Sequence, residues 1–273
     1  MKLIVHADDL GETAEITYGI FECIDVGVVT STSILANMPA TDFALSEVLK
    51  YGCDVSFGVH INLCEGRPLT KPRTLTQPDG MFLPKREVAL NAIFGRLDLK
   101  EVETELSAQI ESIMRNGIQI SHIDSHKHLH QLPGISKVVV GLARNYGIER
   151  IRCTLEKGIW PRGLGISARI SRLVRGYLAK LAGSYFKEAR LRYPDRVFDI
   201  RELITQKTHN KRLAFLKRME GITEMFCHPG TAKADKEKPG SCERYSEFQF
   251  LLSDEFRFLI DEVPIKFKTY LDC

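Results

Sequence analysis

Histidine and aspartate residues gather in four short segments of this sequence, in patterns that favour metal binding or acid–base chemistry. The chain has eight histidines, and four of them lie within nine residues in the segment SHIDSHKHLH. The other segments are HADDLG near the start, GVHINL, and MFCHPG towards the end. Imidazole and carboxylate groups bind zinc and other divalent cations, and they also act as general acids and bases.

HADDLG places two adjacent carboxylates, Asp8 and Asp9, at the end of an apolar run and before a glycine. Adjacent like charges repel each other unless a cation or a shared proton compensates them. One interpretation assigns one carboxylate to a metal and the other to proton transfer. The alternative is that Asp9 caps a helix that begins near Glu12.

Two histidines lie singly in apolar strand patterns. His60 is within GVHINL, and His228 is followed by a Pro-Gly pair that ends its strand. A histidine at the end of a strand suits a general acid. Taken alone, however, His60 is more typical of a buried core residue than of a ligand, and His228 is equally compatible with a loop residue.

The cluster SHIDSHKHLH predicts a strand in which every even-numbered position from 122 to 130 lies on one face. That face would carry His122, Asp124, His126, His128 and His130. In a helix, three of the histidines would align at i, i+4 and i+8 instead, but the β-branched residues before the cluster favour the strand. Because buried imidazoles need hydrogen-bond partners, we expect a metal site or a substrate-binding rim. The alternative is a surface strand rich in histidine.

Apolar runs alternate with amphipathic stretches along the chain, the pattern of an α/β protein with a parallel sheet. The expected strands are Leu3–Ala7, Ser31–Asn37, Ser56–Leu63, Ile118–Asp124, Ile151–Leu155, Arg196–Ile200, Thr223–Cys227 and Ile265–Tyr270. The expected helices are Glu12–Asp25, Asp42–Leu49, Leu99–Arg115, Ile135–Tyr146, Ile166–Arg190, Asn210–Met219 and Arg244–Asp261. The proline-rich stretch Pro68–Pro84 is expected to be a long loop. Because parallel strands share one carboxyl edge, the four chemical segments should converge there.

Composition excludes several classes of protein. Hydrophobic residues make up 44% and charged residues 27%, which excludes a disordered or collagen-like chain. The seven scattered cysteines contain no C-x-x-C, so neither a disulfide framework nor a zinc ribbon is expected. No nucleotide-binding glycine motif and no G-x-S-x-G elbow occur. Without a signal-peptide pattern or a run of about 20 apolar residues, a cytoplasmic protein is expected.

Positive charge is concentrated in one part of the chain, although the net charge is only +3. Between Arg150 and Arg218 there are 18 Lys or Arg against 5 Asp or Glu. Within this part, the stretch Ile166–Arg190 is predicted to be a basic amphipathic helix, which either packs on the outside of the sheet or lies on an anionic membrane surface. Its apolar stripe comprises Ile166, Ile170, Leu173, Tyr177, Leu178 and Leu181. No recognition motif for nucleic acid accompanies the charge, so no nucleic-acid partner is expected.

Taken in order, these segments resemble the YdjC-like carbohydrate deacetylase family. The matching stretches are HADDLG, GVVTSTSILAN, GVHINLCEGRPL, SHIDSHKHLHQLP and TEMFCHPG, spread from Leu3 to Gly230. The resemblance implies a distorted (β/α) TIM-like barrel with seven or eight parallel strands. It also implies one domain over 1–273, with a basic helical segment at about 156–218, and metal-dependent removal of an N-acetyl group from an amino sugar.

The resemblance assigns roles to the residues of the four segments. It implies that Asp9, His60 and His126 bind one divalent ion, Zn²⁺ or Mg²⁺. Asp8 is expected to be the catalytic base, and His228 the acid that protonates the leaving amine.

Supporting roles follow from the same resemblance. Asp124 is expected to orient a ligand histidine, and Arg152 to hold Asp8 ionised. His128 and His130 are expected to support the site or to contact the substrate.

The substrate and the partners remain alternatives at this stage. The basic segment favours members that act on lipid-linked amino sugars, with peripheral contact to the inner face of an anionic membrane. The alternatives are a chito-oligosaccharide deacetylase with an ordinary basic helix, another metal-dependent hydrolase or isomerase on the same barrel, and a non-catalytic binding module. A homo-oligomer is compatible with all of them.

Overall fold

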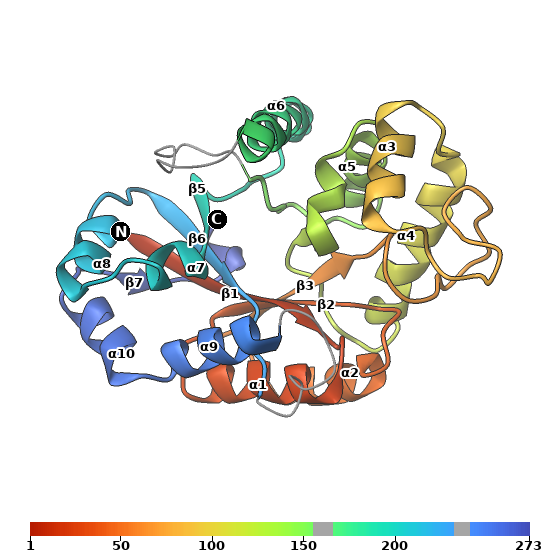
Figure 1. The fold of residues 1–273 in the computed structure, drawn as a ribbon. Helices are drawn as coiled ribbons and strands as arrows, with labels where there is room; N and C mark the ends of the chain where they lie inside the picture. The colour runs from red at the N-terminus through yellow and green to blue at the C-terminus, as the bar shows by residue number, and fades with distance from the viewer. Residues whose placement is uncertain (155–165, 232–240) are drawn as a thin grey trace.

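The computed structural model describes residues 1–154, 166–231 and 241–273 (Figure 1). The strands of these residues are β1 (Lys2–Leu10), β2 (Ser31–Ile34), β3 (Ser56–Ile61), β4 (Ile123–Ser125), β5 (Arg196–Asp199), β6 (Ile222–Cys227) and β7 (Lys266–Phe267). Their α-helices are α1 (Ala14–Asp25), α2 (Thr41–Val48), α3 (Lys85–Ile93), α4 (Leu99–Met114), α5 (Ile135–Asn145), α6 (Ile166–Glu188), α7 (Ile200–Ile204), α8 (His209–Leu216), α9 (Ser241–Leu251) and α10 (Asp254–Asp261). Two short 3-10 helices complete them, η1 (His126–Gln131) and η3 (Tyr270–Asp272).

All of these strands belong to one parallel sheet, which curls into a half-barrel. Neighbouring strands pair in the order β4-β3-β2-β1-β6-β5, and β7 pairs with the first residues of β1. Two isolated parallel bridges, Ile123 with Ile151 and Arg150 with Arg192, span the gap between β4 and the segment before β5. The barrel-like α/β fold expected from the sequence is therefore confirmed.

The strands are buried on both faces, but the two faces differ in chemistry. On β1, Leu3, Val5 and Ala7 belong to the hydrophobic core between the sheet and the helices. Side chains alternate along a strand, so His6 and Asp8 face the barrel interior, and both are buried. The same alternation on β3 and β4 turns further polar side chains inwards. The interior is consequently a polar layer whose members must satisfy one another's hydrogen bonds.

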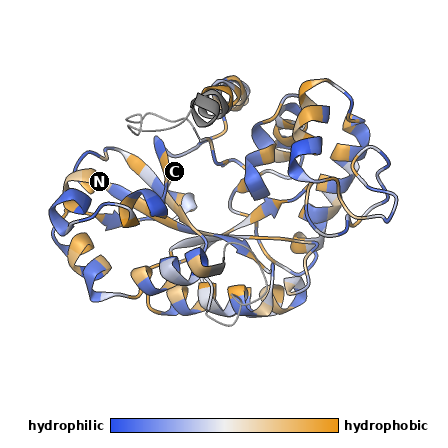
Figure 2. Cartoon of the chain, viewed as in Figure 1, coloured by the Kyte–Doolittle hydropathy of each residue, from blue (hydrophilic) through white to orange (hydrophobic). Residues whose placement is uncertain are grey.

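Helices cover the outside of the sheet through apolar stripes. In α4, Val102, Leu106, Ile110 and Ile113 recur at helical spacing, and each is 0% exposed. Helix α4 packs beside α5, and α5 beside α6 (Figure 1). Both hydrophobic and hydrophilic residues are visible along these peripheral helices in Figure 2, as expected for helices with one buried side.

The histidine cluster does not form the long strand predicted for it. Only Ile123–Ser125 is strand, and η1 begins at His126. Lys127 and His128 have left-handed backbone φ angles of 58° and 59°, which end the alternation of side chains. The prediction of a single polar face through position 130 was therefore wrong.

Other elements differ from the prediction in extent. The strand expected at Ile151–Leu155 is reduced to the bridge at Ile151, and Leu155 lies outside the described residues. The single helix expected over Arg244–Asp261 is two helices, because Ser253 starts a new one by accepting a hydrogen bond from a backbone N–H. Helices α3 and α7 were not predicted. Pro68–Pro84 forms the expected loop.

Helix α6 contains the described part of the predicted basic segment, and residues 155–165 lie outside the described part of the chain. Two side chains of the predicted apolar stripe, Ile166 and Ile170, also lie outside the described part of the chain. In the remainder, Ala182 and Phe186 are buried, whereas Leu173 and Tyr177 are 56% and 68% exposed. Leu173 and Tyr177 of the predicted stripe are therefore not on the packing face. Among the described helices, none combines the length and the apolar character needed to cross a bilayer.

Candidate metal centre and catalytic site

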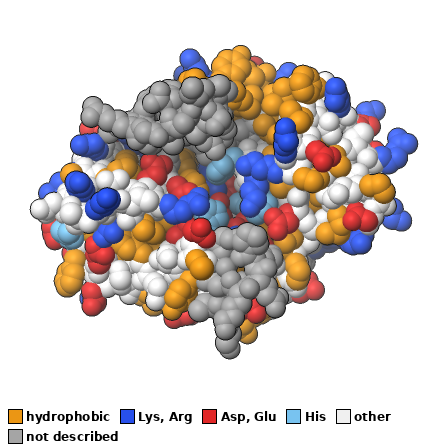
Figure 3. All heavy atoms as spheres, viewed as in Figure 1, with side chains coloured by type: hydrophobic (Ala, Val, Ile, Leu, Met, Phe, Trp, Pro, Cys, Tyr) orange, Lys and Arg blue, Asp and Glu red, His pale blue; other side chains and the backbone are white. Residues whose placement is uncertain are grey.

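Parallel strands bring the chemical segments of the sequence to one end of the barrel. The residues that meet there are Asp8 and Asp9 from β1, His60 from β3, Asp124 from β4, His126 from the start of η1, and His228 directly after β6. Histidine side chains are visible in a central hollow in Figure 3, bordered by acidic and basic side chains. The structure thus brings together residues that lie up to 220 positions apart in the sequence.

An irregularity in β1 allows two consecutive carboxylates to face the same site. Asp9 has a backbone φ of 69°, and the pairing of β1 with β2 shifts register at this point. In a regular strand, Asp8 and Asp9 would point to opposite faces. A positive φ at a non-glycine residue costs about 1–3 kcal/mol and is characteristic of functional sites. The helix-cap alternative for Asp9 is wrong, because Thr13 caps α1 by accepting from the Ile16 N–H.

Asp9, His60 and His126 form a compact group of potential metal ligands. One ligand atom from each lies within 4.8 Å of the others. The Oδ1 atom of Asp9 is 3.2 Å from His60 Nε2 and 2.7 Å from His126 Nδ1. All three residues are buried. One carboxylate and two imidazoles make a donor set suited to zinc and similar divalent cations.

Each histidine of this group has its second ring nitrogen next to a carboxylate. His60 Nδ1 lies 2.8 Å from Asp124 Oδ1, and His126 Nε2 lies 2.9 Å from Glu65 Oε2. Histidines that bind metals commonly donate their other N–H to a carboxylate, which fixes the tautomer and the ring orientation. The sequence analysis expected this position for Asp124 but did not identify Glu65. The residues present therefore fit a divalent cation.

The surrounding carboxylates favour the protonated forms of both histidines. Burial lowers the pKa of His60, but the charge and hydrogen bond of Asp124 outweigh burial and raise the pKa to about 10. Burial likewise lowers the pKa of His126, and the opposing effect of Asp9 raises it overall. A cation must therefore compete with two protons for these nitrogens.

Asp8 is held by a buried guanidinium. Arg152 Nη1 and Nη2 donate to the two oxygens of Asp8 at 2.8 and 2.7 Å, and Arg152 Nε donates to Glu224 at 2.8 Å. Burial raises the pKa of Asp8, but the charge of Arg152 outweighs burial and lowers the pKa to about 2. These contacts favour the ionised form of Asp8, which is the form that can accept a proton.

His228 lies near Asp8 and is more accessible than Asp8, with 24% of its side chain exposed against 4% for Asp8. Its Nε2 is 3.8 Å from Asp8 Oδ2. Glu247 of α9 accepts a hydrogen bond from the His228 backbone N–H at 2.5 Å and lies 3.7 Å from Nδ1. Burial lowers the pKa of His228, but Glu247 and Asp8 raise it overall. This environment favours an imidazolium that can donate a proton.

Arg244, at the start of α9, adds a positive charge beside the metal ligands. Its Nη2 lies 2.6 Å from Asp9 Oδ2 and 2.7 Å from Glu12 Oε2. Its Nη1 is buried and has no hydrogen-bond partner. Arg244 thus fixes the Asp9 oxygen that does not face the histidines.

Two further histidines of the cluster, His128 and His130, belong to none of the groups of potential metal ligands among the described residues. His130 is 0% exposed, and its nitrogens pair with Ser125 Oγ at 2.5 Å and with the Arg152 carbonyl at 2.8 Å. It therefore supports the backbone of Arg152. His128 is half-buried, and its ring lies edge-on to Phe226.

Four residues of the site were not found by the sequence analysis: Glu65, Glu224, Arg244 and Glu247. Glu65 lies five positions after His60, so its segment was identified but its role was not. The other three are isolated charged residues within a strand or a helix, and no local spacing distinguishes them. Only the fold places them beside Asp9, Arg152 and His228.

The chain also matches a protein family and proteins that have been described. The family model described as YdjC-like protein matches residues 2–262. The chain belongs to the YdjC-like family. A protein of this chain's length from Enterococcus faecalis, described as a cellobiose-phosphate cleavage protein, has a solved structure that superposes with a TM-score of 0.76 at 27% identity, over 99% of this chain and 98% of that one.

Relatives in the same family have been named for an activity. A carbohydrate deacetylase from Halalkalibacterium halodurans is 41% identical over 149 residues, and carbohydrate deacetylase 1 from Listeria innocua is 44% identical over 149 residues. Each match covers 54% of this YdjC-like chain, but only 62% and 59% of the respective relative.

Proposed function

We propose that this YdjC-like protein is a carbohydrate deacetylase that removes an N-acetyl group from an amino sugar with the help of one divalent cation. The observation that carries the proposal is the buried Asp9–His60–His126 group beside Asp8, whose pKa is lowered, and His228, whose pKa is raised. The names of the two relatives support the acetylated carbohydrate as substrate.

The cation would be held by Asp9, His60 and His126, and when bound it supplies a Lewis acid for the amide carbonyl and for water. Asp8 accepts a proton from the attacking water as the new C–O bond forms. Arg152 keeps Asp8 ionised for this step. As the C–N bond breaks, His228 donates a proton to the leaving nitrogen, so the products are acetate and a free amino sugar.

An acetate-release assay tests the proposed reaction. The full chain, loaded with Zn²⁺ or Mg²⁺, is incubated with N-acetylated hexosamines and chito-oligosaccharides, and free acetate is measured. We expect acetate release that a chelator abolishes and added metal restores. Turnover of a sugar without acetate would indicate another hydrolase or an isomerase, and binding without turnover would indicate a non-catalytic module.

We further propose that the sugar is lipid-linked and that α6 contacts an anionic membrane surface. The supporting observation is an exposed apolar group on α6 in a strongly basic part of the chain. Leu173, Val174 and Tyr177 are 56%, 46% and 68% exposed, and Lys180 lies close by in the helix. Apolar side chains with flanking basic residues are typical of helices that lie in a membrane interface.

Vesicle binding separates this proposal from the chito-oligosaccharide alternative. We expect the protein to bind vesicles that contain anionic phospholipid more tightly than neutral vesicles, with binding that weakens as salt is added. Leu173→Ser and Tyr177→Ser should reduce binding, whereas Tyr18→Ser, an exposed tyrosine on α1, should not. Equal binding to neutral and anionic vesicles contradicts a preference for an anionic surface, and binding to neither contradicts membrane contact.

A further inference from the structure

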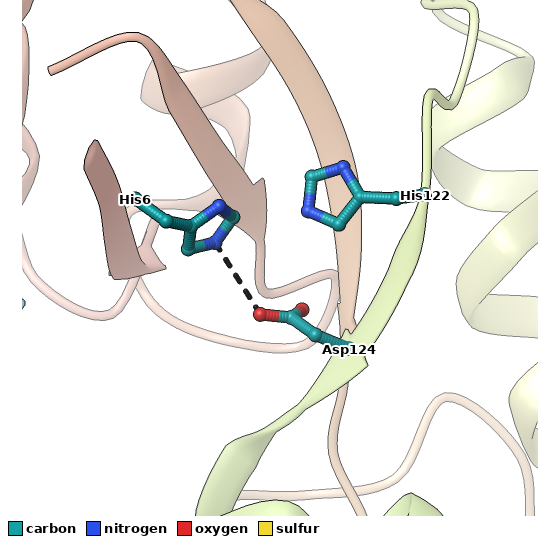
Figure 4. A group of neighbouring side chains, drawn as sticks. All are labelled: His6, His122 and Asp124. Carbon is teal, nitrogen blue, oxygen red and sulfur yellow. Dashed lines mark ion pairs between the residues drawn. The ribbon is translucent and has the colours of Figure 1, made fainter. Parts of the chain in front are cut away.

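A second group of potential ligands lies deeper in the barrel, below the site described above. It consists of His6 from β1, Asp124 from β4, and His122 from the residues just before β4 (Figure 4). One ligand atom from each lies within 4.8 Å of the others, and all three residues are 0% exposed. Figure 4 shows both imidazole rings turned towards the Asp124 carboxylate.

The hydrogen bonds around His122 define which of its nitrogens can accept. Ser121 Oγ donates its only proton to the Phe57 carbonyl at 2.8 Å. The same oxygen lies 2.8 Å from His122 Nδ1, so it accepts a hydrogen bond from an Nδ1–H. The Nε2 of His122 therefore carries a lone pair, and this atom is buried without any hydrogen-bond partner.

Asp124 offers a second unsatisfied acceptor to the same space. Its Oδ2 is buried without a hydrogen-bond partner. Arg152 Nη1 forms an ion pair with this oxygen at 3.0 Å, and His6 Nε2 lies 3.3 Å from it. Two buried acceptors of one ligand group thus lack hydrogen bonds, and of the two only Asp124 Oδ2 has a cationic neighbour, so a cation bound to both would satisfy them together.

The chain makes specific room for the His122 ring. A Cβ atom at Gly58 would lie 2.5 Å from His122 Cε1 and Nε2, so any other residue at that position would displace the ring. On another side Tyr270 stacks on His122, with ring centroids 3.7 Å apart and an interplanar angle of 5°. The position of the unpartnered nitrogen is therefore fixed by its surroundings.

Charge also favours a cation in this layer. Arg152 contacts three carboxylates, those of Asp8, Asp124 and Glu224. A cation bound to Asp124 would be repelled by the Arg152 guanidinium, but the excess of carboxylates offsets that repulsion. Zinc holds nitrogen and oxygen donors at about 2.0–2.2 Å, so side-chain shifts of about 1 Å would bring the three donors onto one ion.

We propose that His6, His122 and Asp124 form a second, fully buried site for a divalent cation of the zinc class. This site is distinct from the Asp9–His60–His126 group, and it does not depend on the proposed reaction. Because its donors are 0% exposed, the ion exchanges slowly and acts as a structural centre that ties β1 to the segment before β4.

Zinc stoichiometry tests the proposal. The full chain is produced with Zn²⁺ in the medium and desalted, and its zinc content is measured by mass spectrometry. We expect two ions per wild-type chain, and one in His122→Ala and in His6→Gln. His130→Gln is the matched control, because His130 is equally buried but has both nitrogens paired, and it should keep two ions.

The same zinc measurement tests the proposed catalytic centre separately. His126→Ala should lose one ion, and the double variant with His122→Ala should lose both. If the wild type holds only one ion and His122→Ala holds one as well, the buried site is overturned and its space is assigned to water. The same holds if both His122→Ala and His6→Gln keep two ions.

A crystal of the zinc-loaded wild type provides a test without any substitution. Anomalous scattering at the zinc absorption edge should give a peak between His6, His122 and Asp124. A peak at the Asp9 group without one at the buried group would overturn this inference and leave the proposed function intact.

Discussion

The hydroxyl of Tyr270 is predicted to stabilise the protein through the carboxylate network beneath Asp8. It donates to Glu224 Oε2 at 2.6 Å, and both residues are 0% exposed. The other Glu224 oxygen accepts from Arg152, which in turn holds Asp8. Tyr270→Phe removes the hydroxyl but keeps an aromatic ring to stack on His122.

The magnitude follows from the charge and burial of the acceptor. A hydrogen bond to a charged group contributes about 1.5–3 kcal/mol. In a protein of this size a loss of 1 kcal/mol lowers Tm by roughly 2–4 °C, so Tyr270→Phe should lower it by roughly 3–12 °C. Thermal unfolding is followed by circular dichroism at one fixed scan rate, because Tm depends on scan rate when unfolding is irreversible.

Tyr51→Phe is the matched control. Tyr51 also donates to a carboxylate, that of Asp25 at 2.7 Å, and its ring also stacks, on Phe21. That hydrogen bond is exposed, so its loss should cost less than about 0.5 kcal/mol. Equal shifts in Tm for Tyr51→Phe and Tyr270→Phe would refute the reasoning, because burial would then not decide the contribution.

Three further predictions concern the site itself. Glu65→Gln should weaken Zn²⁺ binding by about 10–100-fold, because the group that orients His126 loses its charge. The affinity is measured by competition with a chromophoric chelator. An unchanged affinity would show that Glu65 does not act through the His126 ring. Glu247→Gln should lower kcat by up to about 100-fold with little change in KM. The amide oxygen still accepts a hydrogen bond from the His228 backbone N–H, but a neutral side chain no longer favours the His228 imidazolium. A kcat equal to that of the wild type would contradict this prediction. The apparent Zn²⁺ affinity should rise from pH 6 to pH 8, by up to about tenfold per pH unit for each proton released. The reason is that the pKa values of His60 and His126 are raised, so protons compete with the cation at low pH. An affinity independent of pH would show that neither histidine binds the cation.

The sequence was sufficient to predict the site where reactive side chains fall within or at the end of an apolar strand pattern. Asp8 and Asp9 end an apolar strand, and His60 interrupts another, so a parallel sheet alone implies that they meet. In the histidine cluster, an alternating pattern led to a wrong prediction of a long strand. Alternation through position 130 suggested one long strand, but the strand ends at Ser125, and the backbone is left-handed at Lys127 and His128 within η1. No local residue preference indicates this change.

The parts of the site that escaped prediction come from elements without a distinctive pattern. Glu247 and Arg244 lie on α9, which the sequence analysis merged with α10 into one helix. Their roles depend on where α9 packs, a tertiary property that residue spacing does not encode. Tyr270 and Glu224 likewise matter only because the C-terminal segment packs against the barrel interior.

The central claim is that Asp8 transfers protons beside a cation that Asp9, His60 and His126 hold. Asp8→Asn tests it most directly, with zinc content and acetate release measured on the same preparation. The account predicts wild-type zinc content with acetate release reduced by about 10²–10⁴-fold. Acetate release near the wild-type rate, or loss of zinc together with activity, would contradict the separation of base and metal ligand between Asp8 and Asp9.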